Sequence, residues 1–493
     1  MPALRRRAAL VCLAAIVSTG CGLQPDARTA LDERADLVSA GVDAGLEAAV
    51  DSPGAGAVGP EGTVSDSTSA TSPHLLGGST STTTGSGSSG SSGSGSSGSS
   101  GSTGTRSGST GSAGSGSGSG STTTTKSTTI GVTDTEIRIG IHAPLSGASP
   151  LPQESFESGK DMYWKGKTVF GRKIVVEVLD DTYKPSGAVR VCQEMARRDF
   201  IVLGAAGTDQ IQACGRDRSL QRTHTPYLSA GVTENGLTGI PTYFALSLTY
   251  REQGPMVMEN ARRQDFLTKK NAAGESKWAV VISDTPNFKD AQDSIEAALK
   301  AEKIPYKVFL TSKTPSDSDA TALGNELRAY NAPVVYFLGQ PTFFIKVVTN
   351  TANSLYTPIW TGIGPSMAVN AVANVACPGS GNRYDGRFLH PYQGFDKAPP
   401  EFLKAGGIDD IQMSLWLSAE MLHNLLLTMN GVVTRESFTS SIVGPTFSTD
   451  GKPFVKFAGS NHFGGLAAYS LKSNCSTRRY DTLFDGKPLY AKK

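Results

Sequence analysis

The segment 200–236 constrains the fold most, because it places two short apolar runs on either side of a helical segment. The first run covers residues 201–205 and the second covers 226–230. Short apolar runs separated by a helix indicate parallel strands that are covered on both faces. Glycine and hydroxyl residues follow both runs: Gly204, Gly207 and Thr208 after the first, and Ser229, Gly231 and Thr233 after the second.

These two loops predict half of a small-molecule site. In open α/β sheets, ligands bind beyond the carboxyl ends of the strands, where N–H groups at helix starts are free. Glycine lets the backbone approach a ligand closely, and hydroxyl groups add adaptable donors. Tight turns between a strand and a helix also often carry Gly and Thr, so an ordinary structural turn is the alternative interpretation.

The same alternation of strands and helices continues from residue 134 to the end of the chain. These roughly 360 residues exceed what one hydrophobic core usually supports, so we expect two lobes. Two successive β-α-β sets favour an α/β fold with two doubly wound parallel-sheet lobes over a barrel, which needs eight regular repeats. Further strands are predicted at 137–143, 173–179, 243–248, 278–282, 306–310, 334–338 and 358–360, and strand-like segments at 444–447 and 454–471. The pattern also predicts a helix that opens at 254–255, a glycine-rich loop at 362–365 and a long apolar helix at 410–429.

Residues 1–21 have the pattern of a secretory signal. Three arginines precede an apolar run at 8–17 that is too short to span a bilayer. Residues 18–21 are similar to a bacterial lipoprotein box, in which the cysteine is acylated, although Ser18 stands where that box usually has leucine. We therefore expect an exported protein that Cys21 anchors on the outer face of the cytoplasmic membrane. Plain secretion is the alternative.

Two further segments precede the folded part of the chain. Residues 22–64 have too few leucines to build a core, and no function is assigned to them. Residues 65–129 are almost entirely Ser, Gly and Thr, so they cannot offset the entropy of ordering. Such a segment predicts a tether with a reach of roughly 40–50 Å. A low-complexity insertion without a spacing role is the alternative.

The charge balance and the histidines argue against several functions. The net charge of +2 gives no electrostatic basis for binding nucleic acid. The six histidines are scattered, and none pairs with a nucleophile motif. Asp180 and Asp181 are adjacent on a predicted strand and so face opposite ways, which excludes a catalytic acid pair. We expect no enzymatic activity and no cofactor.

The cysteine count predicts disulfides. Of six cysteines, Cys12 leaves with the signal and Cys21 carries lipid, which leaves four in an exported body. Cys192 and Cys214 lie on consecutive predicted helices that flank one sheet, so we pair them. The remaining pair is Cys377 with Cys475, unless those two stay reduced. The cysteines and histidines do not have metal-site spacing, so no metal is expected.

Several segments resemble the leucine/isoleucine/valine-binding family of periplasmic-type solute receptors. They are IRIGIHAPLSG (137–147), DDTYKPSGAV (180–189), VLGAAGTDQ (202–210), PYLSAGVTENGLT (226–238) and IVGP (442–445). The resemblance covers nearly all of 134–493, and it is specific through the order and spacing of these segments. It implies two lobes joined by three hinge strands, with the ligand trapped as the lobes close.

Matching positions place the three hinge crossings near Leu248, His390 and Gly444. The resemblance therefore implies a first lobe of 134–248 plus 390–444. The second lobe would be 249–389 plus 445–493.

The resemblance also implies ligand-binding residues. The hydroxyl that holds the ligand carboxylate falls on Thr208, and the next binding loop falls on Gly231, Val232 and Thr233. The aromatic lid of the second lobe falls on Phe288, and a further position of that lobe falls on Gln340. Tyr183 follows two acids at a strand end, where lining the cleft and packing in the core are both open.

One position departs from the family pattern. The acid that holds an α-ammonium group falls at or beside Ile363, and a buried unpaired ammonium is costly. Asp209 or Glu234 could replace that acid, or both could be solvated loop residues.

The resemblance implies the solute-binding lipoprotein of an ABC importer. Its ligand would be a small polar organic molecule, similar to a branched-chain amino acid or an amide, and its partner an ABC permease in the membrane. We expect a monomer that does not bind nucleic acid. A sensory receptor that binds the same kind of ligand and acts through a separate membrane protein is the alternative.

Overall fold

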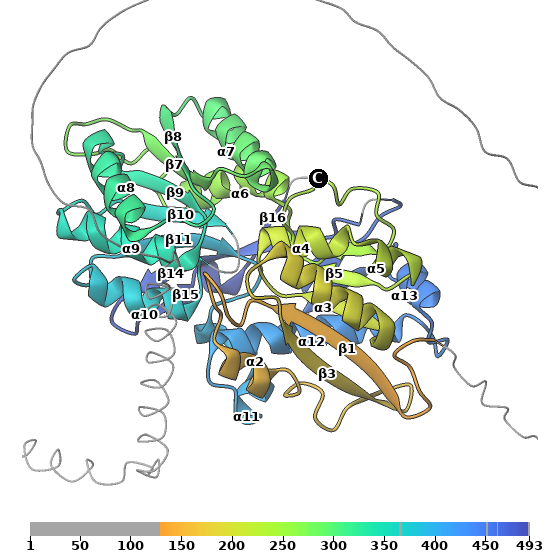
Figure 1. Cartoon of the computed structure of the whole chain (residues 1–493). Coiled ribbons are helices and arrows are strands. Elements are labelled where there is room, and N and C mark those ends of the chain that lie inside the picture. The colour runs from red at the N-terminus through yellow and green to blue at the C-terminus, as the bar shows by residue number, and fades with distance from the viewer. Residues whose placement is uncertain (1–128, 364–366, 450–451, 461, 492–493) are drawn as a thin grey trace, which may run out of the picture. The chain divides into compact units, whose positions relative to one another are not determined.

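The computed structural model describes residues 129–363, 367–449, 452–460 and 462–491. The expected signal, Cys21 and nearly all of the expected tether lie outside these residues. The described part of the chain folds around two β-sheets with helices packed against them (Figure 1). Among the described helices, none is both long enough and apolar enough to cross a membrane.

The first sheet has the strand order β2-β3-β1-β4-β5-β6, and all neighbours are parallel except the hairpin β2-β3. Its strands are β1 (Glu136–Ala143), β2 (Thr168–Val169), β3 (Arg172–Asp180), β4 (Ile201–Gly204), β5 (Tyr227–Ser229) and β6 (Tyr243–Ala245). The associated helices are α2 (Gln153–Gly159), α3 (Pro185–Arg198), α4 (Thr208–Gly215), α5 (Arg218–Arg222), η2 (Phe395–Lys397), α11 (Pro400–Lys404), α12 (Asp410–Leu427) and α13 (Arg435–Ser441).

Both faces of this sheet are covered, as the continuous apolar runs predict. Side chains alternate along a strand, so Val202 packs with α3 and α4 while its neighbour Ile201 packs on the opposite face with α12. In β5, Tyr227 packs on the face covered by α3 and α4, and Leu228 packs on the face covered by α12. On the α12 face, the packing leaves a cavity.

The second sheet has the order β15-β14-β11-β10-β9-β7-β8, and β16 pairs with β14. Its strands are β7 (Trp278–Ser283), β8 (Tyr306–Thr311), β9 (Val334–Leu338), β10 (Ile359–Ile363), β11 (Asp385–His390), β14 (Ala467–Asn474), β15 (Arg479–Thr482) and β16 (Leu489–Tyr490). Its helices are α6 (Tyr250–Arg263), η1 (Pro286–Phe288), α7 (Lys289–Ala301), α8 (Asp317–Tyr330), α9 (Pro341–Asn353), α10 (Asn370–Gly379) and η3 (Phe484–Gly486). The doubly wound α/β prediction is confirmed, but β14, β15 and β16 add an antiparallel edge that the sequence pattern did not predict.

The chain passes between the sheets three times, and the third passage comes later than expected. The first follows β6 and the second follows β11, close to Leu248 and His390. The small hairpin of β12 (Thr446–Thr449) and β13 (Lys452–Lys456) still packs in the core of the first lobe through Phe447 and Val455. The last passage therefore lies at 463–467 and not near Gly444, because these apolar side chains fill the core beside α12.

Helix α6 also begins earlier than predicted. Thr249 and Glu252 form a capping box that starts the helix at Tyr250, so Gly254 and Pro255 lie inside it. Glycine is needed at 254 because a Cβ there would lie 2.6 Å from the backbone oxygen of Ser294 on α7. The Gly-Pro pair thus marks a close helix contact and not a helix start. The loop expected at 362–365 likewise begins later, because Gly362 and Ile363 still belong to β10.

Each sheet carries one disulfide. Cys192–Cys214 joins α3 to α4, and Cys377–Cys475 joins α10 to the segment after β14. This is the pairing expected from the sequence. In the chain-entropy model, loops of this size contribute about 3 and about 4.7 kcal/mol to stability.

Candidate functional site

A cavity lies between the carboxyl end of the first sheet and elements of the second lobe, and we call it the interlobe cavity. It encloses about 680 Å³, including its open mouth. The first lobe lines it with Pro144, Ser149, Leu151, Tyr183, Ala205, Ala206, Gly207, Thr208, Ile211, Ala230, Gly231 and Val232. The second lobe lines it with Tyr250, Phe288, Leu338, Gly339 and Pro341. Of the residues predicted for the site, the structure brings Tyr183, Thr208, Gly231, Val232 and Phe288 together here.

The start of α4 supplies the polar end of the cavity. Gly207 caps this helix with φ 85°, a left-handed conformation that favours glycine, and Thr208 is the first helical residue. The N–H groups in the first turn of a helix have no intrahelical partner. Together with the helix dipole, they favour an anion at this position.

Two aromatic residues of the second lobe cover this helix start. The hydroxyl of Tyr250 hydrogen-bonds to the hydroxyl of Thr208, across the lobes. The Tyr250 ring stacks on Phe288, with ring centroids 5.6 Å apart and an interplanar angle of 18°. Burial raises the pKa of Tyr250, so its hydroxyl stays protonated and can donate a hydrogen bond. The predicted lid Phe288 therefore works as half of an aromatic pair.

Tyr183 lies in a loop that side-chain carboxylates hold in place. Its φ of 53° is left-handed, and its N–H donates to Oδ1 of Asp181 at 3.0 Å. The other oxygen of Asp181 pairs with Nδ1 of His142, a residue of β1, at 2.9 Å. Burial raises the pKa of Tyr183, so this residue also presents a neutral phenol to the cavity.

The second binding loop is built around the hinge. The N–H of Gly231 donates to Oγ of Ser247 at 2.8 Å, and a Cβ at 231 would lie 2.5 Å from the carbonyl carbon of Leu248. Gly231 therefore allows the first hinge strand to pass close to the cavity wall. Thr233 is fully buried, and its hydroxyl accepts a hydrogen bond from the N–H of Asn235 at 3.1 Å. Thr233 does not line the cavity.

Asp209 and Glu234 bind other protein groups in this structure. Asp209 is 8% exposed; its carboxylate forms an ion pair with Lys313 and accepts from Asn287 Nδ2 at 2.5 Å, both from the second lobe. Glu234 accepts from the hydroxyl of Thr249 at 2.7 Å. Neither acid lines the interlobe cavity.

Gln340 also lies outside the cavity lining. It is buried at the N-terminal end of α9, and its amide donates to the backbone oxygen of Lys313 at 2.6 Å. This bond holds the loop that carries the Lys313 partner of Asp209. Its neighbours Gly339 and Pro341 line the cavity instead.

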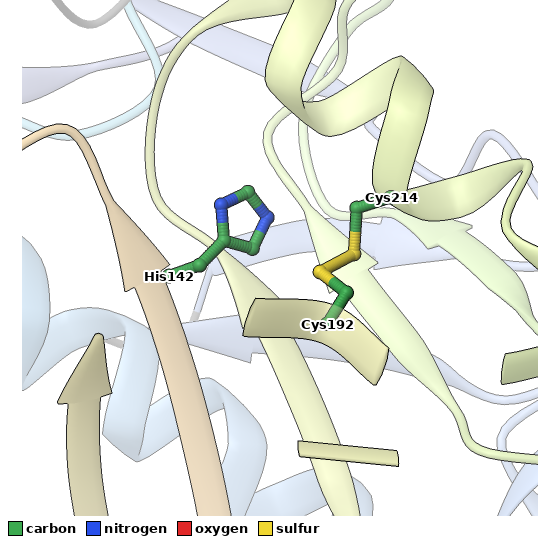
Figure 2. A group of neighbouring side chains, drawn as sticks. All are labelled: His142, Cys192 and Cys214. Atoms are coloured by element: carbon green, nitrogen blue, oxygen red, sulfur yellow. A yellow bond between two sulfur atoms is a disulfide. The ribbon is translucent and has the colours of Figure 1, made fainter. Parts of the chain in front are cut away.

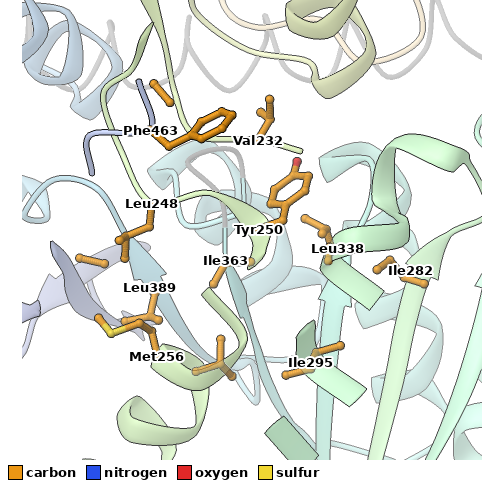
Figure 3. Packing of buried hydrophobic residues seen from close by; sticks show 14 of the residues in the cluster. Val232, Leu248, Tyr250, Met256, Ile282, Ile295, Leu338, Ile363, Leu389 and Phe463 are labelled. Atoms are coloured by element: carbon orange, nitrogen blue, oxygen red, sulfur yellow. The ribbon is translucent and has the colours of Figure 1, made fainter. Parts of the chain in front are cut away.

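Ile363 belongs to an apolar cluster beneath the site. It is 2% exposed and packs in the core that contains Tyr250 and Leu338 (Figure 3). A carboxylate at this position would lose its hydration without a partner in that core. Ile363 thus fills this part of the core with a hydrocarbon side chain.

Comparison with known proteins identifies the family. Residues 136–474 match the family model described as periplasmic binding protein. The chain belongs to the periplasmic binding protein family. A binding protein of this kind is not an enzyme, which agrees with the scattered histidines. Among curated proteins, none matches this sequence.

Solved structures with the same fold are distant in sequence. One is a fatty acid ABC transporter substrate-binding protein from Thermomonospora curvata, with 16% identity over 74% of this chain and 95% of that chain and a TM-score of 0.60. A branched-chain amino acid ABC transporter protein from Thermus thermophilus with bound valine has 16% identity, coverage of 72% and 96%, and a TM-score of 0.57. A solute binding protein from Rhodopseudomonas palustris BisB5 with 3,4-dihydroxy benzoic acid has 16% identity, coverage of 72% and 95%, and a TM-score of 0.56. These likenesses show the fold.

The binding protein has a second, larger cavity between the first sheet and α12, which we call the sheet–helix cavity. It encloses about 1030 Å³, including its open part. Strand and loop residues on one side are Ile141, Leu203, Gly204, Ala205, Ala206, Leu228, Ser229, Ala230, Leu246 and Ser247. Residues of other segments are Leu151, Phe156, Val369, His390, Pro391, Tyr392, Ile411, Ser414, Leu415, Ser418 and Leu422. The sequence patterns did not predict this cavity.

One group of potential metal ligands occurs within the described residues of the binding protein. His142, Cys192 and Cys214 offer ligand atoms within 4.8 Å of one another (Figure 2). The two cysteines form a disulfide and so have no thiolate to offer. His142 Nδ1 pairs with Asp181 at 2.9 Å and its Nε2 with the hydroxyl of Tyr227 at 2.8 Å. This group is therefore a buried structural cluster.

Sequence reasoning missed Tyr250 because it placed the start of α6 too late. The pattern Thr249-x-x-Glu252 is a capping-box signature and could have placed the helix start at Tyr250. The lining residues Leu338, Gly339 and Pro341 lie at the carboxyl end of a correctly predicted strand, so the same strand-end argument used for the first lobe could have found them.

Proposed function

We propose that this binding protein is the solute-binding component of an ABC importer and that it holds a small organic carboxylate in the interlobe cavity. The observation that carries the proposal is the start of α4, which lines the cavity with Gly207 and Thr208 and whose first-turn N–H groups have no intrahelical partner. The ligands named for the three structural neighbours, fatty acid, valine and dihydroxybenzoic acid, are all carboxylic acids.

The residues around the helix start would divide the work of binding. The carboxylate accepts hydrogen bonds from the first turn of α4 and from Thr208, while Tyr183 offers a further phenol. Tyr250 and Phe288 close over the ligand from the second lobe. The Tyr250–Thr208 hydrogen bond and the Asp209–Lys313 ion pair span the lobes, so both must break when the lobes open.

The ligand we propose has no α-ammonium group, so it is a simple carboxylate and not an amino acid. The resemblance places the usual acid at or beside Ile363, whose side chain is buried. Asp209 and Glu234 already bind Lys313 and Thr249. An ammonium group in this cavity would therefore lack a carboxylate partner, which is costly away from water.

Calorimetric titration of the purified protein with benzoate, benzamide and valine tests the proposal. We expect benzoate to bind and benzamide to bind at least 10-fold more weakly, since hydrogen bonds to a charged group contribute about 1.5–3 kcal/mol. Thr208→Ala should weaken benzoate binding about 10-fold for the same reason. Thr321→Ala, on the exposed face of α8, is the matched control and should change nothing. Equal affinity for benzoate and benzamide would contradict the proposal.

Export, lipid anchoring through Cys21 and docking on a membrane permease belong to the same proposal. The family supports an extracytoplasmic location. The anchor is tested by fractionation, in which Cys21→Ser should move the protein from the membrane to the soluble fraction.

A further inference from the structure

We propose that the sheet–helix cavity receives the aliphatic chain of the same ligand, so that the substrate is a carboxylate with an unbranched apolar chain. This inference rests on the proposed function, because the carboxylate end of the ligand would occupy the interlobe cavity. It adds a second binding site, inside the first lobe, for the apolar end of the ligand.

The two cavities share a wall that is built mostly from residues with small side chains. Leu151, Ala205, Ala206 and Ala230 line both of them. Three of these four residues are alanines, so little side-chain volume separates the two spaces. The pair 205–206 directly precedes Gly207 and Thr208. A ligand whose carboxylate lies at the start of α4 therefore has its remaining atoms beside this wall.

The surface of the sheet–helix cavity is mainly hydrocarbon. Branched aliphatic side chains of the sheet face those of α12 across it: Ile141, Leu203 and Leu228 on one side, and Ile411, Leu415 and Leu422 on the other. Among the described residues that line it, none is Asp, Glu, Lys or Arg. A charged or strongly polar occupant would thus lose its hydration without compensation.

The polar side chains that line this cavity already have protein partners. Ser229 donates to the Ala230 oxygen at 2.9 Å, and Ser414 donates to the Asp410 oxygen at 2.8 Å. Ser418 bonds to the Tyr392 hydroxyl at 2.7 Å, Ser247 accepts from the Gly231 N–H at 2.8 Å, and His390 Nδ1 lies 2.9 Å from the backbone oxygen of Tyr392. Water needs several polar partners to be held in a cavity, and these side chains offer few. An apolar occupant has no hydrogen bonds to lose here, and the burial of its surface is favourable in free energy.

A chain of methylene groups fits this combination better than a second, independent small molecule. The volume of about 1030 Å³ is of the size that small-molecule sites have. Its wall adjoins the polar site, and its own surface offers no anchor for a separate polar ligand. One amphipathic molecule would place its carboxylate in the interlobe cavity and its apolar chain in the sheet–helix cavity.

A chain-length series on the full protein tests this inference. Affinities of unbranched alkanoates from butanoate to dodecanoate are measured by calorimetry below their micelle concentrations. We expect the affinity to rise about three- to four-fold per added methylene until the cavity is filled. The series needs no mutant, so it stays informative whatever a variant does to folding.

Filling the cavity gives a second readout. Ser414→Leu places a larger side chain on α12 inside the sheet–helix cavity and away from the interlobe cavity. We expect it to weaken dodecanoate binding at least 10-fold and to leave butanoate binding unchanged. Ser440→Leu is the matched control, because Ser440 makes the same hydrogen bond to the residue four before it but lies exposed on α13.

The outcomes separate the two proposals. Equal affinities for butanoate and dodecanoate, both sensitive to Thr208→Ala, would overturn the tail site and leave the proposed function intact. Failure of every carboxylate to bind would overturn the proposed function itself. Binding of an uncharged aromatic such as naphthalene alongside bound dodecanoate would also overturn the inference, because the cavity would then be a separate site.

Discussion

The interlobe cavity and the sheet–helix cavity lie side by side but differ in which parts of the chain build them. The interlobe cavity is complete only when Tyr250 and Phe288 of the second lobe cover the start of α4. The sheet–helix cavity lies mostly within the first lobe, and only Val369 and the 390–392 hinge segment come from elsewhere. Polar recognition is thus tied to lobe closure, whereas the apolar space exists within one lobe.

This difference has an energetic consequence. Contacts across the lobes exchange with water each time the lobes open, so they add little net stability and can act as a reversible latch. Packing within a lobe is made on folding and persists. Substitutions at the two cavities should therefore have separable effects on affinity and on stability.

The largest expected effect comes from the glycine that lies where the hinge passes the interlobe cavity. Gly231→Ala forces a Cβ to within 2.5 Å of the Leu248 carbonyl carbon, and overpacking of this kind costs about 1–3 kcal/mol. Urea denaturation should show that loss together with weaker binding of every carboxylate. Gly324→Ala, inside α8 and 3.3 Å from the nearest side-chain atom, is the control and should cause no loss. Equal stabilities of the two variants would contradict the close approach at the hinge.

A smaller effect is expected from the latch. Lys313→Met removes the ion pair with Asp209 across the lobes; the lysine side chain is 38% exposed, so solvent screens the pair. We expect carboxylate affinity to fall about five-fold (~1 kcal/mol) for short and long chains alike, since only the closed state contains the pair. The control is Lys289→Met, whose ion pair with Asp293 lies within α7. If only the long-chain carboxylates lost affinity, the effect would lie in the sheet–helix cavity. The contrast between the two cavities would then be wrong.

The last expected effect is a pH dependence of stability at Asp410, which precedes Ile411 of the sheet–helix cavity lining. Asp410 accepts a hydrogen bond at 2.7 Å from the N–H of Asn370, the first residue of α10, and burial raises the pKa of Asp410 to about 7. A carboxyl whose pKa is raised by folding binds more protons in the folded state, so its contribution to stability is lost as pH rises from about 4 to about 7. Asp410→Asn should remove this loss, which is at most ~1.4 kcal/mol per pH unit.

Urea denaturation between pH 4.5 and 7.5 measures this prediction as the difference between the variant and the wild type. Asp396→Asn is the control, because Asp396 also accepts a backbone N–H, from Thr482 at 2.9 Å, but is exposed. Parallel stability profiles for Asp410→Asn and the wild type would show that Asp410 does not titrate in this range.

Much of the fold could be predicted from local patterns. Buried strands such as β4, β7 and β9 were predicted as short apolar runs, because this signal depends on neighbouring residues only. The antiparallel edge of the second sheet and the late third hinge crossing could not be predicted, since strand direction and the packing of Phe447 depend on distant partners.

Some residues of the candidate site could likewise be predicted from local patterns, and others could not. Thr208 and Gly231 were predicted because ligands gather at the carboxyl ends of parallel strands, and both line the interlobe cavity. Asp209 looked equally suitable, but its carboxylate is used by Lys313, about a hundred residues later in the chain. Spacing within a loop cannot show which side chains face a cavity and which face another lobe.

The sequence by itself determined the α/β alternation and the Gly- and Thr-bearing strand ends, because these follow from periodicity and local backbone chemistry. The family was indicated by the resemblance of whole segments and is shown by the match of residues 136–474. Only the tertiary structure decided that an apolar space remains between the first sheet and α12. That space depends on how completely side chains from segments over two hundred residues apart, such as Ile141 and Leu422, fill the volume between them.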